Sequence, residues 1–221
     1  MTRLGLLVVL LLAFALTSGV ARANVVPNPD FEIVGSNGTP FTESVTGSTP
    51  ESAAQSWFHW HPTPSSFIST ELIPSTDPAG GGNMLVMTTN GGICCGGSTA
   101  NGVFASLPPL PVGSHGSFDI FVPDGVSGDI GFVNSASAFD TGSFAFSGTG
   151  GAWQTVSFTN LDSPTTEIGF EIFAFPAGAL GSIAVDRAAA VPEPGTGALV
   201  LLGLGFAAIA RARRGAAQMA G

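Results

Sequence analysis

The side chains best suited to chemistry in this chain lie in one short segment, residues 57–62. It holds two of the three Trp and two of the three His residues of the chain. On a β-strand, successive side chains point to opposite faces, so His59 and His61 would share a face with Trp57, while Trp60 would lie on the other face. An exposed indole can stack on the apolar face of a sugar ring, with a His beside it as hydrogen-bond donor.

Three interpretations of this segment stay open. In the first, Trp57, His59, Trp60 and His61 form a carbohydrate-binding surface. In the second, His59 and His61 share a transition-metal ion, for which i and i+2 spacing on one strand face is suitable. In the third, the two indoles pack in the core or at its edge and the His side chains lie at the rim.

The only two cysteines, Cys94 and Cys95, are adjacent and flanked by glycines. In an oxidising compartment free thiols rarely persist, and the flanking glycines give the backbone the freedom that a strained vicinal disulfide needs. We therefore predict such a disulfide, which would stiffen a loop. Intermolecular crosslinking, or metal ligation together with His59 or His61, are the alternatives. No CxxC pattern indicates a zinc site.

The N-terminus has the parts of a secretory signal peptide. A short basic start is followed by an apolar run from Leu4 to Leu16 and by the small residues Ala21 and Ala23. We predict a signal peptide over residues 1–23, cleaved by signal peptidase after Ala23. An uncleaved anchor is the alternative, but the apolar run is shorter than the ~20 residues of a spanning helix.

The C-terminus combines Pro192, Glu193 and Pro194 with an apolar run over residues 196–210 and with three arginines at 211, 213 and 214. A helix over this run would rise about 22 Å, which makes it a short, marginal transmembrane anchor. The three parts together resemble the PEP-CTERM sorting signal. The resemblance implies recognition of Pro192, Glu193 and Pro194 by an exosortase, a membrane enzyme of Gram-negative bacteria. We assign residues 191–214 to this signal and 215–221 to a cytoplasmic tail.

Residues 24–190 form the remaining domain, and its charge is strongly acidic. Fourteen of the fifteen acidic residues lie there, against Arg187 alone, which leaves a net charge of −13 for the domain compared with −9 for the chain. Nucleic-acid binding needs cationic side chains and is excluded. The mean hydropathy of +0.42 therefore averages two apolar terminal segments with an acidic body.

Short segments of alternating hydrophobicity recur along residues 24–190, separated by Gly, Pro, Ser, Asn and Asp. In Ile168–Ile172, for example, the apolar side chains share one face and Glu171 lies on the other. Such strands predict an antiparallel all-β fold, and we expect a jelly-roll-like β-sandwich between a signal helix and a short transmembrane helix. The segments expected to be strands are 83–88, 102–106, 117–122, 128–133, 142–147, 154–159, 168–172 and 182–186.

The opening sequence Asn24–Glu32 resembles the "NLVxNxxFE" start of carbohydrate-binding modules with a galactose-binding-like jelly roll, and residues 151–156 resemble their "GxWQxY" segment. The resemblance implies a structural calcium ion, with Glu32 and Asp186 as ligands and Asp30 beside them. Calcium also needs backbone carbonyls, which this Gly- and Pro-rich region could supply. Solvated acids at strand ends are the alternative. Arg187 stands where that family has a second Asp.

No catalytic residues are identified, because the chain has no GxSxG, HExxH, P-loop or dinucleotide motif. We therefore expect a non-catalytic exported protein that passes through an inner-membrane intermediate to the outer surface or extracellular matrix of a Gram-negative bacterium. There its jelly roll would bind or organise exopolysaccharide in a biofilm. A purely structural acidic matrix protein and a secreted hydrolase are the alternatives.

Overall fold

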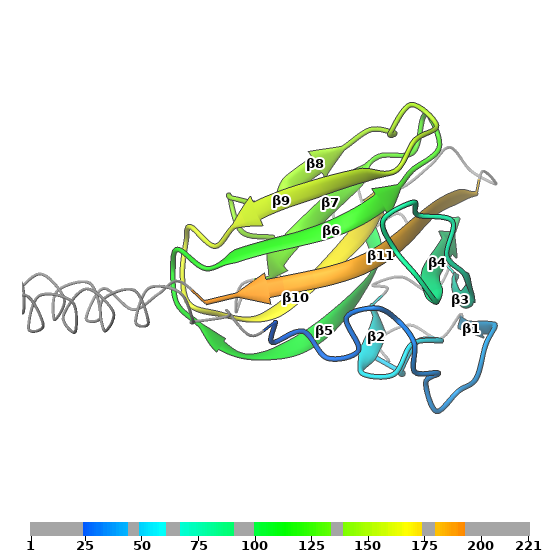
Figure 1. Ribbon diagram of the computed structural model, residues 1–221, viewed down its shortest axis with the longest axis horizontal. Helices are drawn as coiled ribbons and strands as arrows, with labels where there is room; N and C mark the ends of the chain where they lie inside the picture. Colours follow the sequence, from blue (N-terminus) through cyan, green and yellow to red (C-terminus); the bar gives the residue numbers. More distant parts are fainter. Residues whose placement is uncertain are drawn as a thin grey trace, which may run out of the picture.

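The computed structural model describes residues 24–43, 49–60, 67–90, 100–133, 139–173 and 180–192. This part of the chain is all β, with two antiparallel sheets packed face to face (Figure 1). The predicted β-sandwich is confirmed, whereas the predicted signal helix and C-terminal helix lie outside the described residues. The strands are β1 (Phe41–Glu43), β2 (Trp57–Trp60), β3 (Ile68–Pro74), β4 (Asn83–Thr89), β5 (Ala100–Leu110), β6 (His115–Phe121), β7 (Gly128–Val133), β8 (Phe144–Phe146), β9 (Gln154–Thr159), β10 (Thr165–Phe173) and β11 (Gly181–Val191).

One sheet has the order β1-β3-β4-β11-β6-β9 and the other has the order β2-β5-β10-β7-β8. Side-chain alternation sets their inner faces. In β10, Ile168, Phe170 and Ile172 are buried, while Glu171 lies on the outer face. The period of two expected for a half-buried strand is thus observed where the sequence predicted it.

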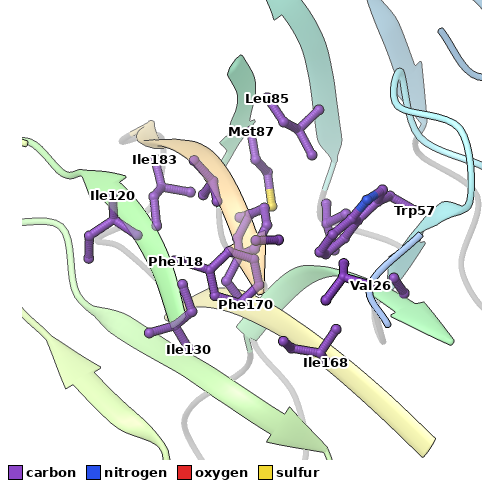
Figure 2. Packing of buried hydrophobic residues seen from close by; sticks show 14 of the residues in the cluster. Val26, Trp57, Leu85, Met87, Phe118, Ile120, Ile130, Ile168, Phe170 and Ile183 are labelled. Atoms are coloured by element: carbon purple, nitrogen blue, oxygen red, sulfur yellow. The ribbon is translucent and has the colours of Figure 1, made fainter. Parts of the chain in front are cut away.

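The core between the sheets is built around the Trp57 ring, whose side chain has no exposed surface. Its centroid lies 5.1 Å from that of Phe31, 6.0 Å from Phe118 and 6.4 Å from Phe170. Figure 2 shows Trp57, Phe118 and Phe170 pointing toward the same interior. The rings come from both sheets and from the N-terminal segment, so this cluster joins the two layers.

The start of the described chain is fastened to the end of β11. The Asn24 side chain donates a hydrogen bond to the Ala188 carbonyl oxygen (2.8 Å) and accepts one from the Ala190 amide (3.0 Å) and another from the Val26 amide (3.1 Å). Asn24 is the predicted first residue of the processed chain, and Pro192 of the sorting motif directly follows β11. The two predicted processing points therefore lie at the same end of the sandwich.

We expect Asn24→Ala to lower the free energy of unfolding by about 1 kcal/mol, because three hydrogen bonds of one partly buried amide are lost. Urea denaturation of the variant and the parent would measure the difference. Gln55→Ala is the matched control, since its exposed side-chain amide makes no hydrogen bond within the described residues. Equal midpoints for both variants would contradict the anchoring role.

Candidate functional site

A groove of about 280 Å³ lies on the outer face of the five-stranded sheet. Its walls carry the aromatic rings of Trp60, Phe104 and Phe139, together with the carboxylates of Glu167 and Glu171. Ligand pockets in proteins start at about 300 Å³, so this groove has room for one small unit rather than for a large ligand. Its open shape suits a unit of a longer chain lying across it.

Strand register brings these side chains together. Trp60 of β2 is the Cα partner of Gly102 in β5, Gly102 pairs with Glu171 in β10, and Glu171 pairs with Asp129 in β7. A Cβ atom at Gly102 would lie 2.7 Å from the Phe170 carbonyl oxygen, so no other residue fits there without displacing backbone. A position without a side chain between Trp60 and Glu171 keeps the groove open.

A second row of cross-strand partners lies beside the row of Trp60, Gly102 and Glu171, and it also contains glycines. Phe104 of β5 pairs with Gly169 of β10, which pairs with Gly131 of β7. A Cβ at Gly169 would lie 2.6 Å from the Val103 carbonyl oxygen. Phe104 is therefore followed across the sheet by two positions with no side chain, and its ring borders the open floor of the groove.

The acidic side chains of this face carry an electrostatic cost. Burial, followed by repulsion from Asp129, raises the pKa of Glu171 to about 7. Burial also raises the pKa of Asp129 and that of Glu167. Within the described ranges none of the three carboxylates has a hydrogen bond or an ion pair. Like charges directly opposite each other on neighbouring strands are destabilising, so the fold keeps an unfavourable acidic pair at this place.

The structure separates the residues of the Trp–His segment. Trp60 lines the groove, but Trp57 and His59 have no exposed surface and cannot contact a sugar. The core interpretation is correct for Trp57, whose Nε1–H donates to the Pro27 carbonyl oxygen (3.2 Å). His61 lies outside the described residues. Of the three predicted sugar-contacting residues that the structure describes, Trp60 alone remains a candidate.

His59 belongs instead to a buried polar group between the edges of the two sheets. Its Nε2 lies 2.8 Å from the Thr70 hydroxyl oxygen, and its Nδ1 lies 3.6 Å from a carboxylate oxygen of Glu43. The Phe41 ring stacks on the imidazole at a centroid distance of 5.1 Å. These contacts enclose the imidazole, which places His59 within the structural framework and away from the groove. The shared metal ion of His59 and His61 stays a prediction, because His61 lies outside the described residues.

The three residues of the predicted calcium site do not meet at one point. Asp30 is exposed, while Glu32 accepts a hydrogen bond from the Asn83 amide (2.7 Å). Asp186 accepts hydrogen bonds from the Ser75 hydroxyl (2.5 Å) and the Arg187 amide (2.7 Å). In the described part of the chain, no three His, Cys, Asp or Glu side chains lie close enough to hold a metal ion. The calcium ion stays a prediction.

Asp186 lies instead beside Asp77 and Asp119, and the cation of this acid cluster is Arg187. The guanidinium contacts a carboxylate oxygen of Asp119, and its Nε lies 3.4 Å from a carboxylate oxygen of Asp77. Burial, the largest cause, raises the pKa of Asp119 and that of Asp186. Asp77 and Asp119 are nearly inaccessible, whereas the Arg187 side chain is 39% exposed. At the position where the resembling family has a second Asp, this chain thus supplies its own cation.

Two further predictions fall outside the described residues. They concern the Cys94–Cys95 disulfide and the Glu193 and Pro194 positions of the sorting motif. Pro192, the first residue of that motif, is described and follows β11 without an intervening turn. The described residues include no helix with the length and apolar character to span a membrane.

Most of the groove was not predicted from the sequence. Phe104, Asp129, Glu167 and Glu171 were not expected as site residues, although the alternation of residues 168–172 already assigned Glu171 to the outer face. Acidic side chains are common on the solvent-facing side of a strand, so this assignment did not indicate a site. Glu171 differs from an ordinary surface acid only because it lies opposite another acid and beside Trp60.

Comparison with known proteins identifies the C-terminus and the fold. Residues 190–214 match the family model described as the PEP-CTERM protein-sorting motif. No curated protein matches the chain. Among solved structures, an arabinose-bound α-L-arabinofuranosidase is similar over 81% of this chain, with 18% identity and a TM-score of 0.50. The similarity covers only 28% of that enzyme.

Two other solved structures are carbohydrate-binding modules. The family 11 module of a cellulosomal cellulase from Clostridium thermocellum is 15% identical over 68% of this chain and 97% of the module, with a TM-score of 0.42. A module described as belonging to the β-sandwich superfamily is 13% identical, with a TM-score of 0.43, over 77% of this chain and 63% of the chain of that module. At such identities a likeness concerns the fold alone. The chain is thus an exported β-sandwich protein that carries a PEP-CTERM protein-sorting motif at residues 190–214, the signal that exosortases process.

Proposed function

We propose that the groove of the five-stranded sheet binds exopolysaccharide and that the protein organises this polymer in the biofilm matrix or at the outer surface of a Gram-negative bacterium. The observation that carries the proposal is the placement of Trp60 and Phe104 beside the carboxylates of Glu167 and Glu171 in one open groove. Aromatic faces stack on sugar rings, and carboxylates accept hydrogen bonds from sugar hydroxyl groups. Ligand-binding sites typically have aromatic and apolar walls with a small number of polar groups, which fix the orientation of the ligand.

The proposed route to that location has two cleavages. Signal peptidase would remove residues 1–23, and the C-terminal helix over residues 196–210 would hold the protein in the inner membrane with residues 215–221 in the cytoplasm. Exosortase would then act at the Pro192–Pro194 motif and release or transfer the sandwich. The match to the sorting motif supports this route, as does the meeting of Asn24 with β11 at one end of the domain.

We expect Trp60→Ala to weaken retention on a bound polysaccharide by about tenfold or more, because a Trp in the centre of a contact commonly contributes about 2 kcal/mol. Affinity electrophoresis of the full chain in gels containing soluble polysaccharides would measure this, starting with the polymer of the producing bacterium. Trp153→Ala is the matched control. The Trp153 indole hydrogen-bonds Thr76 (3.2 Å), packs on Phe121 and takes no part in the groove.

Equal retention of the two variants would contradict a role for the groove. Failure of the parent chain to bind any polysaccharide in the panel would instead favour a purely structural acidic matrix protein. Circular dichroism of each variant would show that the loss arises from the site rather than from unfolding.

A second candidate function is glycoside hydrolysis, which one observation favours. Glu171, with a pKa of about 7, stands opposite a second carboxyl on the neighbouring strand, Asp129. Enzymes that cleave glycosidic bonds use one protonated and one ionised carboxyl group in this way. Release of reducing ends from a retained polysaccharide, abolished by Glu171→Gln, would establish it. Retention without any release would establish binding alone.

A further inference from the structure

We propose that the groove selects a polysaccharide whose sugar units carry free amino groups, protonated to ammonium, and that it rejects polysaccharides built from uronic acids. The inference rests on the proposed carbohydrate-binding function and names the chemical class of the polymer. It is carried by three acidic side chains in and beside the groove, which have no Lys or Arg partner among the described residues.

The three carboxylates lie on adjacent strands. Glu171 of β10 pairs with Asp129 of β7, and Glu167 lies four residues before Glu171 on the same outer face. Arg187 is the only Lys or Arg between Arg22 and Arg211. Its guanidinium is engaged by Asp119 of β6, on the other sheet, and by Asp77 of the loop between β3 and β4. Among the described residues, the groove therefore has no Lys or Arg to neutralise its carboxylates.

A bound ammonium group would offset the cost of this arrangement. Repulsion between Glu171 and Asp129, together with their partial burial, disfavours the ionised carboxylates. An ammonium between them would form charge-assisted hydrogen bonds with both, which are stronger than hydrogen bonds between neutral groups. A uronic acid would bring a further negative charge into the same place and would be repelled.

The aromatic walls favour a sugar over other cations. Trp60, Phe104 and Phe139 offer ring faces that stack on a pyranose and also attract a cation within reach. A bare divalent metal would need several oxygen ligands at one point, and no three acidic or His side chains of the described residues converge in that way. A sugar ring with an ammonium substituent uses both the aromatic and the acidic parts of the groove.

Binding should depend on pH with a maximum. The groups that face Glu171 are Glu167 on its own strand and Asp129 on β7, while β5 and the outward side chains of β2 present no titratable group there. As the pH rises toward 7, Glu171 ionises and attraction grows; at higher pH the amine of the ligand loses its proton and attraction falls. A bound ammonium also lowers the pKa of Glu171, since it favours the ionised carboxylate.

The test compares three hexasaccharides by calorimetry on the full chain. The β-1,4-linked glucosamine hexamer is the ammonium probe, its N-acetylated form is the neutral probe with the same backbone, and a galacturonic acid hexamer is the anionic probe. We expect the glucosamine hexamer to bind about tenfold tighter than the acetylated form at low salt, and the uronic acid hexamer not to bind. The preference should shrink in 0.5 M salt, because a partly exposed charge pair is screened.

Two variants separate the causes. Glu171→Gln should remove most of the preference for the glucosamine hexamer, so that the two hexamers bind with similar affinity. Glu71→Gln, the same change at an exposed site of β3 on the other sheet, should alter neither. Polylysine of similar charge is the control for non-specific binding of polycations. If it bound as tightly as the glucosamine hexamer, the groove would be a general polycation surface and the inference would be overturned.

The two proposals fail in different ways. Equal affinity for the glucosamine and acetylated hexamers would overturn the selectivity and keep carbohydrate binding. Absence of binding to every hexamer, with Trp60→Ala indistinguishable from the parent on polysaccharide gels, would overturn the proposed function itself.

Discussion

Trp57→Ala is expected to remove about 3–5 kcal/mol from the free energy of unfolding. The indole has no exposed surface and contacts rings from three segments, Phe31, Phe118 and Phe170. Truncating a large buried aromatic ring removes its transfer free energy and leaves a cavity. Because a domain typically has about 5–15 kcal/mol of stability in total, the variant should be unfolded or nearly so at 37 °C. Thermal unfolding followed by circular dichroism would measure the loss.

The neighbouring residue provides the control for Trp57. Phe58 lies on the opposite face of β2 and is only partly buried, so Phe58→Ala should cost much less. A melting temperature of Trp57→Ala close to that of Phe58→Ala would contradict the central place of Trp57 in the core. The contrast also separates Trp57 from Trp60, whose replacement should affect binding and not folding.

Arg187→Met should lower the free energy of unfolding by about 2–3 kcal/mol at pH 8. The substitution leaves Asp77, Asp119 and Asp186 together without their cation, and removing one partner of a fully buried ion pair costs about 3–5 kcal/mol. The Arg187 side chain is 39% exposed, so solvent already screens part of the attraction and the expected loss is smaller. Urea denaturation at several pH values would measure it.

The loss should decrease as the pH falls toward 4. Folding raises the pKa of Asp119 and of Asp186 above the ordinary value of 3.8. The folded state therefore holds their protons more tightly than the unfolded state, and the contribution of these groups to stability falls as the pH rises above about 4. Without Arg187 this fall should be steeper, because nothing offsets the ionised carboxylates.

Arg187→Lys distinguishes charge from geometry. It keeps the positive charge but lacks the fork that reaches two carboxylates, so an intermediate stability is expected. If Arg187→Met and the parent lost stability in parallel across the pH range, the guanidinium would not be the cation of this cluster.

Local sequence patterns predicted most of the strands but not all of their limits. The strand over residues 154–159 was predicted with the bounds that β9 has, whereas β1 and β3 were not predicted. In β3 the alternation of Ile68, Thr70 and Leu72 was the available signal, and the polar residues between them obscured it. Such a pattern becomes decisive only when the neighbouring strand is known.

The length of β5 shows a second limit of local patterns. The predicted strand ended at Ser106, before Pro108 and Pro109, which cannot donate a backbone hydrogen bond to a sheet. The observed strand continues to Leu110, since its pairing with β2 ends at Ala105 while its pairing with β10 continues. Beyond Ala105 no strand of the described residues pairs with the second edge of β5, and prolines are tolerated on such an edge.

The sequence by itself determined the all-β class, the acidic character of the domain and the sorting motif, because each depends on contiguous residues or on composition. It also indicated that Trp57 and Trp60 would lie on opposite faces if their segment formed a strand. It did not determine which face is the core, since a period of two is the same whichever side is buried. Tertiary pairing decided that Trp57 is enclosed, that Trp60, Phe104, Glu171 and Asp129 from four strands share one face, and that Arg187 meets Asp77 and Asp119. These groups form through register between strands distant in the chain, which no local pattern encodes.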